Sequence, residues 1–143
     1  MRDGRTPPRR VQLRHAANVE DVRSIAMRRL PLAVRDFIEG GAEDEVTLRR
    51  NRDAFQNAEL RHRVLRDVGS VDMSTTILGS PVSAPIGLCP VGLSGLAHPD
   101  GERVMAIAAG KAGIITTLSS SGTWSIEEVA EAAPDGNRWF QLY

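Results

Sequence analysis

Residues 84–93, APIGLCPVGL, combine a short apolar run with a loop whose backbone is open. The run at 86–89 carries no charge and stands between Pro85 and Pro90, which is typical of a strand buried on both faces. After Pro90 the chain continues through Val91 and Gly92, where proline has no N–H and glycine has no side chain. A flat ligand could therefore lie directly on the main chain, although an ordinary strand-to-loop turn has the same composition.

The overall composition narrows the class of protein. The 143 residues suffice for one domain, but a barrel of eight strand and helix units needs about 250 residues. A formal net charge of zero argues against nucleic acid as a partner, and no apolar run reaches the roughly 20 residues that span a bilayer. Because Cys89 is the only cysteine, no intrachain disulfide can form, and we expect a reducing, cytoplasmic location.

Residues 1–17 form a basic segment, with five arginines opposed by Asp3 alone. We predict a disordered tail there and a folded domain over residues 18–143. A segment rich in arginine and poor in acids is also typical of targeting or membrane-surface segments, so peripheral membrane association stays open.

Three helices are predicted before residue 60. The first begins after Asn18, which precedes apolar residues at helical spacing and two acidic residues in the first turn. Pro31 opens the second helix, which ends at Gly40 and Gly41. The third covers about residues 43–58, and we expect its apolar side chains to face inward and its charged side chains to face water. The apolar set is Val46, Leu48 and Phe55.

From residue 60 onward, segments typical of strands alternate with segments typical of helices. A turn at 79–81 joins two short strands of a hairpin. The other predicted elements, in chain order, are a strand at 86–89, a helix at 103–112, a β-branched strand at 114–118, a helix at 125–133 opened by a capping box of Ser125 and Glu128, and a strand at 139–143. This order predicts an α/β fold with parallel strands joined by crossovers, and three such strands do not close a barrel.

Six segments, in this order and spacing, resemble the FMN-dependent α-hydroxy-acid dehydrogenase and oxidase family, which includes glycolate oxidase, lactate oxidase, L-lactate dehydrogenase and mandelate dehydrogenase. The segments are RDFIEGGAEDEVTLRRN, STTILG, APIGLCPVGL, HPDGE, TLSSSGTWSIEEVA and WFQLY. The resemblance runs from about Val19 to the last residue. It implies the amino-terminal part of a (β/α)8 barrel, with preceding helices, a short hairpin, about three parallel strands and FMN as cofactor. The active site of such a barrel lies at the carboxyl ends of its strands.

The resemblance also implies roles for six residues at three strand ends. Pro90, Val91 and Gly92 match the segment whose backbone lies against the flavin ring, Ser119 and Gln141 match side chains that bond the ring, and Tyr143 matches a tyrosine near flavin and substrate. Because Gln141 and Tyr143 are two apart on one predicted strand, we expect them to share a face.

Phe37 departs from the family pattern. It stands where the family usually has a tyrosine that hydrogen-bonds the substrate carboxylate, so the position lines the substrate pocket while the donor is lost. The family's catalytic histidine, flavin-anchoring lysine, substrate-binding arginines and phosphate loops belong to later segments that this sequence does not contain, so no catalytic residue is assigned. No metal site is predicted.

Two further residues invite a chemical role but favour a structural one. His98 lies in the HPDGE loop, where the family motif is structural, and we expect it to cap or support that loop. Cys89 is expected to be a small buried hydrophobic residue rather than a nucleophile.

The sequence thus predicts a segment of an enzyme that oxidises a small L-2-hydroxy acid, lactate-like, to the 2-oxo acid, inactive by itself and a homo-oligomer at full length. A non-catalytic remnant or interaction module without flavin is the main alternative. A different FMN barrel enzyme, such as a type 2 isopentenyl-diphosphate isomerase, is a third. For the isolated chain we expect open sheet edges and aggregation.

Overall fold

The computed structural model describes residues 15–143, so most of the basic tail predicted for 1–17 lies outside the described residues. The chain separates into two units, which are considered individually: the helical unit, of which 15–58 are described, and the sheet unit, Glu59–Tyr143.

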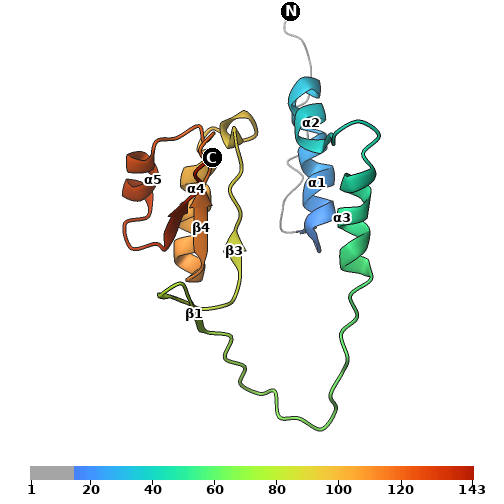
Figure 1. The fold of residues 1–143 in the computed structure, drawn as a ribbon, viewed down its shortest axis with the longest axis vertical. Coiled ribbons are helices and arrows are strands. Elements are labelled where there is room, and N and C mark those ends of the chain that lie inside the picture. Colours follow the sequence, from blue (N-terminus) through green and yellow to red (C-terminus); the bar gives the residue numbers. More distant parts are fainter. Residues whose placement is uncertain (1–14) are drawn as a thin grey trace, which may run out of the picture. The chain divides into compact units, whose positions relative to one another are not determined.

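The helical unit contains three helices, α1 (Val19–Met27), α2 (Leu32–Glu39) and α3 (Val46–Gln56) (Figure 1). The predicted cap is confirmed, since Asn18 Oδ1 accepts a hydrogen bond of 2.9 Å from Asp21 N. Helix α3 begins later than predicted, because Glu43 and Glu45 adopt left-handed backbone conformations that a helix excludes.

Ion pairs connect these helices. Arg23 of α1 pairs with Glu20 on its own helix and with Glu39 of α2. Arg52 of α3 places Nη2 2.9 Å from Glu20 Oε2 of α1. All three helices are therefore held by charged side chains.

The apolar face predicted for α3 is not buried, which corrects the sequence-based expectation. Phe55 is 85% exposed, and Val46 and Leu48 are also exposed. Within residues 15–58 only Ile25 is buried, because three short helices do not by themselves enclose a core.

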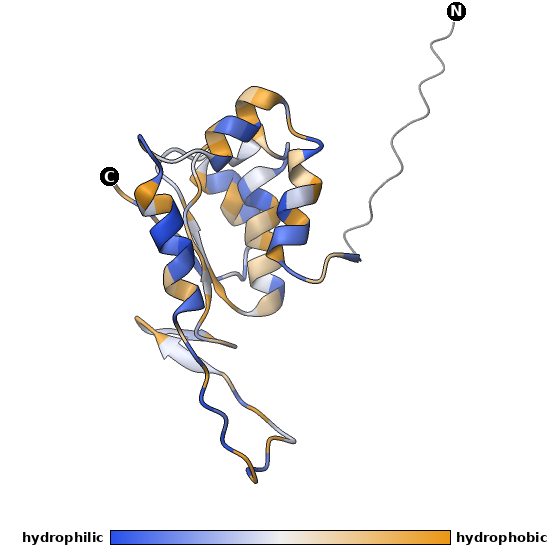
Figure 2. Ribbon diagram, turned by 90° about the vertical axis from the view of Figure 1, so that its right-hand side faces the viewer, coloured by the Kyte–Doolittle hydropathy of each residue, from blue (hydrophilic) through white to orange (hydrophobic). Residues whose placement is uncertain are grey.

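The sheet unit begins with an extended segment, residues 59–74, in which Figure 2 shows hydrophobic and hydrophilic residues interspersed. The predicted hairpin follows: β1 (Thr75–Ile77) pairs antiparallel with β2 (Ser80–Val82). Its turn lies at Leu78 and Gly79 (φ +82°) rather than at 79–81, because Ser80 and Pro81 already belong to β2. Two hydrogen bonds attach the hairpin to the starts of later strands, from Ser83 N to Gly113 O and from Asn137 Nδ2 to Pro81 O, both 2.8 Å.

A parallel sheet forms the centre of the sheet unit, as predicted. Its order is β3 (Gly87–Leu88), β4 (Ile115–Leu118) and β5 (Arg138–Phe140). A short 3-10 helix, η2 (Ser94–Leu96), and α4 (Gly101–Ala112) connect β3 to β4, and α5 (Ile126–Ala132) connects β4 to β5. The capping box at the start of α5 is confirmed, with Ser125 and Glu128 bonded reciprocally.

The core lies where α4 and α5 pack on β4. It consists of Ala106, Leu118, Val129 and Ala133, with Trp124 packed against them. Among the described residues, β3 and β5 each pair with β4 alone, so each leaves one edge open.

The structure corrects three predictions about the segments that contain the outer strands, β3 and β5. The strand at 86–89 is not buried on both faces: Ile86 is 58% exposed and Cys89 is exposed rather than buried. The last strand ends at Phe140, although Gln141 N still donates to Leu118 O at 2.8 Å. Burial requires neighbours on both sides, and only β4 has them here.

Candidate functional site

The carboxyl ends of the three parallel strands place three loops at one edge of the sheet. Residues 90–92 follow β3, Ser119 follows β4 directly, and Gln141 follows β5 directly. We call this group of loop residues the strand-end cluster. Parallel sheets bind ligands at this edge.

Ser119 lies at the centre of the strand-end cluster. It is 5% exposed, its Oγ donates to Gln141 Oε1 at 3.1 Å, and the same Oγ accepts from Ser121 N at 3.1 Å. The structure therefore brings together two residues, Ser119 and Gln141, that the sequence placed in one site.

Gly92 joins the same group. A Cβ built on Gly92 would lie 3.4 Å from Ser121 Cβ and 3.8 Å from Ser119 Oγ, and Leu93 N donates to Ser121 O at 3.0 Å. The loop after β3 is thus tied to the loop after β4. Val91 beside it is exposed, and Pro90 is half-buried.

A buried carboxylate, which sequence reasoning did not single out, holds the loop after β4. Glu102 of α4 is 5% exposed, and its Oε1 accepts a hydrogen bond of 2.8 Å from Thr123 N. Burial is the largest single effect and raises the pKa of Glu102. Hydrogen bonds from Thr123 N–H and from its own N–H, with a contribution from Ser94, together lower the pKa by more than burial raises it, so the carboxyl has a pKa below its usual value. The signal in the sequence is an acid in the first turn of a helix, next to Gly101.

His98 has the structural role expected of it. Its Nδ1 accepts a hydrogen bond of 3.1 Å from Asp100 N, which fixes the loop before α4. Within residues 15–143, no group of three metal-ligating side chains lies together.

The remaining two predicted residues, Tyr143 and Phe37, are both exposed. Tyr143 is 91% exposed, three residues beyond the end of β5, and is not brought against Ser119. Phe37 lies on α2 of the helical unit and is 62% exposed.

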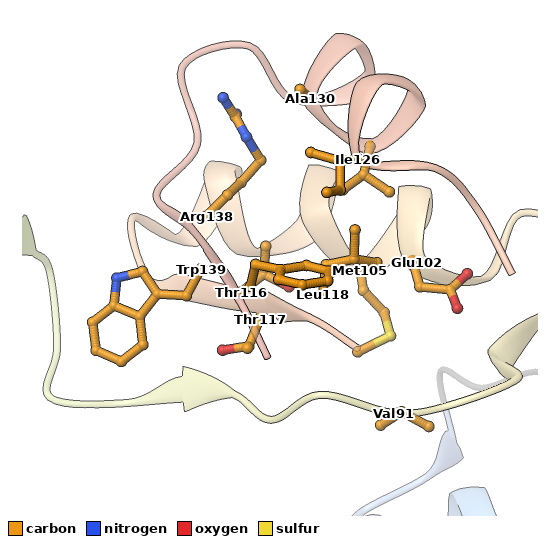
Figure 3. Close-up of a pocket in the computed structure, with 12 residues that line it drawn as sticks. Val91, Glu102, Met105, Thr116, Thr117, Leu118, Ile126, Ala130, Arg138 and Trp139 are labelled. Carbon is orange, nitrogen blue, oxygen red and sulfur yellow. The ribbon is translucent and has the colours of Figure 1, made fainter. Parts of the chain in front are cut away.

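A cavity of about 270 Å³ lies between the sheet and helices α4 and α5, and is a separate feature (Figure 3). Its lining is mostly apolar and includes Met105, Leu118, Ile126 and Phe140. Of the six predicted flavin contacts only Val91 lines it, so the cavity does not coincide with the strand-end cluster.

The strand-end cluster fits part of a flavin. A flat heteroaromatic ring can lie against main chain that carries no side chain, as at Gly92, and it needs donors and acceptors at its edge, which a hydroxyl and an amide supply. None of the six predicted residues is cationic, so they fit the ring rather than the phosphate of FMN.

Comparison with known proteins identifies the family. The family model for FMN-dependent dehydrogenases matches residues 26–143. Glycolate oxidase 5 of Oryza sativa subsp. japonica is 49% identical over 88% of this chain and 34% of its own length. A putative L-lactate dehydrogenase of Mycobacterium tuberculosis is 43% identical over 90% of this chain and 31% of its own.

Solved structures agree with these relatives. A soluble mutant of the membrane-associated (S)-mandelate dehydrogenase from Pseudomonas putida superposes with a TM-score of 0.82 at 44% identity, covering 88% of this chain and 36% of the other. A protein from Pediococcus acidilactici described as a (putative) lactate oxidase gives a TM-score of 0.83 at 33% identity, covering 89% of this chain and 35% of the other.

The chain spans about a third of the length of the curated relatives that it matches. None of the helices in the described part of the chain is long and apolar enough to cross a membrane. On the family match and these identities, the chain belongs to the FMN-dependent dehydrogenase family of 2-hydroxy-acid oxidases and dehydrogenases.

Proposed function

We propose that the sheet unit forms one wall of the FMN site in a barrel oxidoreductase that converts an L-2-hydroxy acid into the 2-oxo acid. The observation that carries this proposal is the meeting of three strand ends, where Ser119 Oγ bonds Gln141 Oε1 beside the bare main chain of Gly92. The three parallel strands are then the first three of the barrel.

Each residue of the wall has a distinct task in this proposal. The main chain at 90–92 supports one face of the ring, and Ser119 and Gln141 orient its polar edge. Tyr143 reaches the ring and the substrate from the end of β5. FMN, when bound, accepts the two electrons that leave the α-carbon of the substrate.

The substrate class rests on the relatives, whose names are those of glycolate, lactate and mandelate enzymes. All three substrates are small 2-hydroxy acids. Because the chain spans a third of these relatives, we expect the proton-accepting base and the cationic groups that bind phosphate and carboxylate to come from polypeptide corresponding to the other two thirds. The chain by itself is therefore expected to hold flavin weakly and to turn over no substrate.

Flavin binding by the chain tests the wall directly. Equilibrium dialysis against FMN up to millimolar concentration, read by flavin absorbance, should give saturable binding. Ser119→Ala and Gln141→Ala should each weaken that binding about fivefold, the effect of one lost neutral hydrogen bond. Matched controls are Ser120→Ala and Gln56→Ala, which alter exposed residues outside the wall.

Two outcomes would overturn the proposal. One is a folded chain, judged by circular dichroism, without saturable FMN binding, which would favour an interaction module without flavin. The other is equal binding by the wall variants and their controls.

A chimera tests the substrate class and the role of Phe37. The later two thirds of the Oryza sativa glycolate oxidase would be fused after this chain, and turnover of glycolate, L-lactate and (S)-mandelate compared. Phe37→Tyr restores a phenol donor and should tighten substrate binding by a factor of about 10 to 150 if that donor reaches the carboxylate. Phe55→Tyr, at another exposed phenylalanine, is the control and should change nothing.

A further inference from the structure

We infer that Glu102 is a positioning residue: its buried carboxylate holds the loop at 119–123 in the conformation that presents Ser119 to a ligand at the strand-end cluster. The inference rests on the proposed function for the identity of the ligand. The holding of the loop by itself does not depend on flavin.

The contact between Glu102 and the loop is direct and closely packed. Glu102 Oε1 accepts from Thr123 N at 2.8 Å, and a Cβ built on Gly122 would lie 3.4 Å from the same oxygen. The same built Cβ would lie 3.0 Å from Leu118 Cδ1 and 3.1 Å from Ser119 O. The loop is therefore closely packed at residue 122, and a side chain there would require these neighbours to shift by a few tenths of an ångström.

Hydrogen bonds continue from this contact to the wall. Thr123 Oγ1 accepts from Gly95 N at 3.0 Å, and Ser121 O accepts from Leu93 N at 3.0 Å. Ser121 N in turn donates to Ser119 Oγ, the hydroxyl that bonds Gln141. Only three residues separate Ser119 from Thr123, so a shift of the loop at Thr123 is expected to move the Ser119 hydroxyl as well.

An oxygen acceptor, rather than an apolar side chain, is needed at this position, and a carboxylate is favoured. Thr123 N–H requires an acceptor, and the first turn of α4 favours a negative charge because its backbone N–H groups point there. Glu102 Oε2 and Ser94 Oγ are also buried, and neither makes a hydrogen bond of acceptable geometry to the described residues, although Ser94 is close enough to lower the pKa of the carboxyl. The cost of burying Oε2 is therefore offset mainly by the bond to the loop and by the helix terminus.

Amide hydrogen exchange of the full chain separates holding the loop from general stability. Glu102→Ala should raise the exchange rates of the Thr123 and Ser121 amides by at least about tenfold, the effect of losing a bond to a charged acceptor, and leave Val129 in α5 unchanged. Glu102→Gln keeps an oxygen acceptor at the same length and should stay within about threefold of the parent. Glu127→Ala and Glu127→Gln, at an exposed acid in the first turn of α5, are the matched controls.

The pH profile is a second readout that a merely space-filling side chain would not affect. In the parent chain, protection of the Thr123 amide should fall only below pH 4.5, the usual carboxyl value, because the folded pKa is lower. In Glu102→Gln this step should be absent. Asp100, whose Oδ1 lies 3.7 Å from Arg103 Nη1, and His98 are retained in both proteins, so they do not account for a difference between the two profiles.

Equilibrium dialysis of the same variants against FMN tests whether holding the loop affects ligand binding. Affinity should fall in Glu102→Ala and be retained in Glu102→Gln. Unchanged Ser121 exchange in Glu102→Ala, or equal acceleration of every amide including Val129, would overturn the inference. If no variant and no parent binds FMN while the exchange results hold, the proposed function fails and the role of Glu102 stands.

Discussion

The helical unit and the sheet unit are each stabilised internally, and the kind of interaction differs between them. In residues 15–58 the helices are joined by the Arg23 and Arg52 ion pairs, and Ile25 is the one buried residue there. In the sheet unit, side chains from α4, β4 and α5 bury one another, with Leu118 and Val129 in the core. Exposed ion pairs contribute little to stability and burial contributes much, so we expect the two units to respond differently to the same kind of change.

The largest expected effect is that of Leu118→Ala in β4. Removing a core leucine should lower the free energy of unfolding of the sheet unit by about 2–5 kcal/mol. Both tryptophans, Trp124 and Trp139, lie in this unit, so urea unfolding followed by tryptophan fluorescence reports it specifically. Leu142→Ala, at an 84% exposed leucine, should leave the midpoint unchanged. Equal shifts for both variants would mean that the assigned core is not a core.

A matched glycine pair tests packing beneath the sheet. Gly113 ends α4 at φ +65°, and a Cβ there would lie 3.1 Å from Ser83 Cβ and closer still to its hydroxyl. Gly113→Ala should therefore destabilise the sheet unit by at least about 1 kcal/mol. Gly110→Ala, inside α4 with its nearest neighbour at 3.7 Å, should stabilise it by about 0.5–1 kcal/mol. Thermal unfolding measures both changes. A Gly113→Ala variant that unfolds at the same temperature as the parent chain would contradict the observed packing.

Removing one helix cap from each unit compares how the two units respond to the same kind of substitution. Ser125→Ala removes the capping box of α5, and Asn18→Ala removes the side-chain cap of α1. Each should cost about 1 kcal/mol. In the sheet unit the loss should appear as a lower midpoint by fluorescence, whereas in the helical unit it should appear as reduced helicity by circular dichroism. A cooperative change in both signals from either variant would show that the units unfold together.

The smallest expected effect is the pH dependence of the link between α1 and α2. The hydrogen bond from Arg23 lowers the pKa of Glu39, against the opposing effect of burial. A carboxyl with a lowered folded pKa contributes stability above its usual value of 4.5, and that contribution is lost as the pH falls through the lower folded pKa. Helicity should therefore fall in acid below pH 4.5, and Glu39→Gln should lack the Glu39 part of that change. Identical helicity profiles against pH for the parent chain and Glu39→Gln would show that the ion pair does not stabilise these helices.

Local signals were sufficient to predict several elements. The starts of α1 and α5 follow from Asn18 and from the Ser125–Glu128 box, whose partners lie within three residues. The parallel sheet follows from the alternation of strand and helix, and the family match supports the resemblance found in the sequence. The meeting of Ser119 and Gln141 follows from that topology.

Burial and long-range contacts could not be predicted in the same way. The exposure of Cys89 and Phe55 depends on what packs beside them, which no local pattern encodes. The hydrogen bond from Thr123 to Glu102 spans 21 residues and joins a loop to a helix, so the local sequence of neither segment predicts it. The late start of α3 reflects the left-handed backbone conformation of Glu45.

The hairpin of β1 and β2 has a practical consequence. It is bonded to Gly113 and Asn137, at the starts of β4 and β5, while the strand-end cluster lies at the opposite ends of those strands. At its tip, a Cβ on Gly79 would meet nothing within 4 Å. A fluorescent label or affinity tag inserted at that tip would therefore report on the folded sheet from a distance, without touching the groups that are proposed to face a ligand.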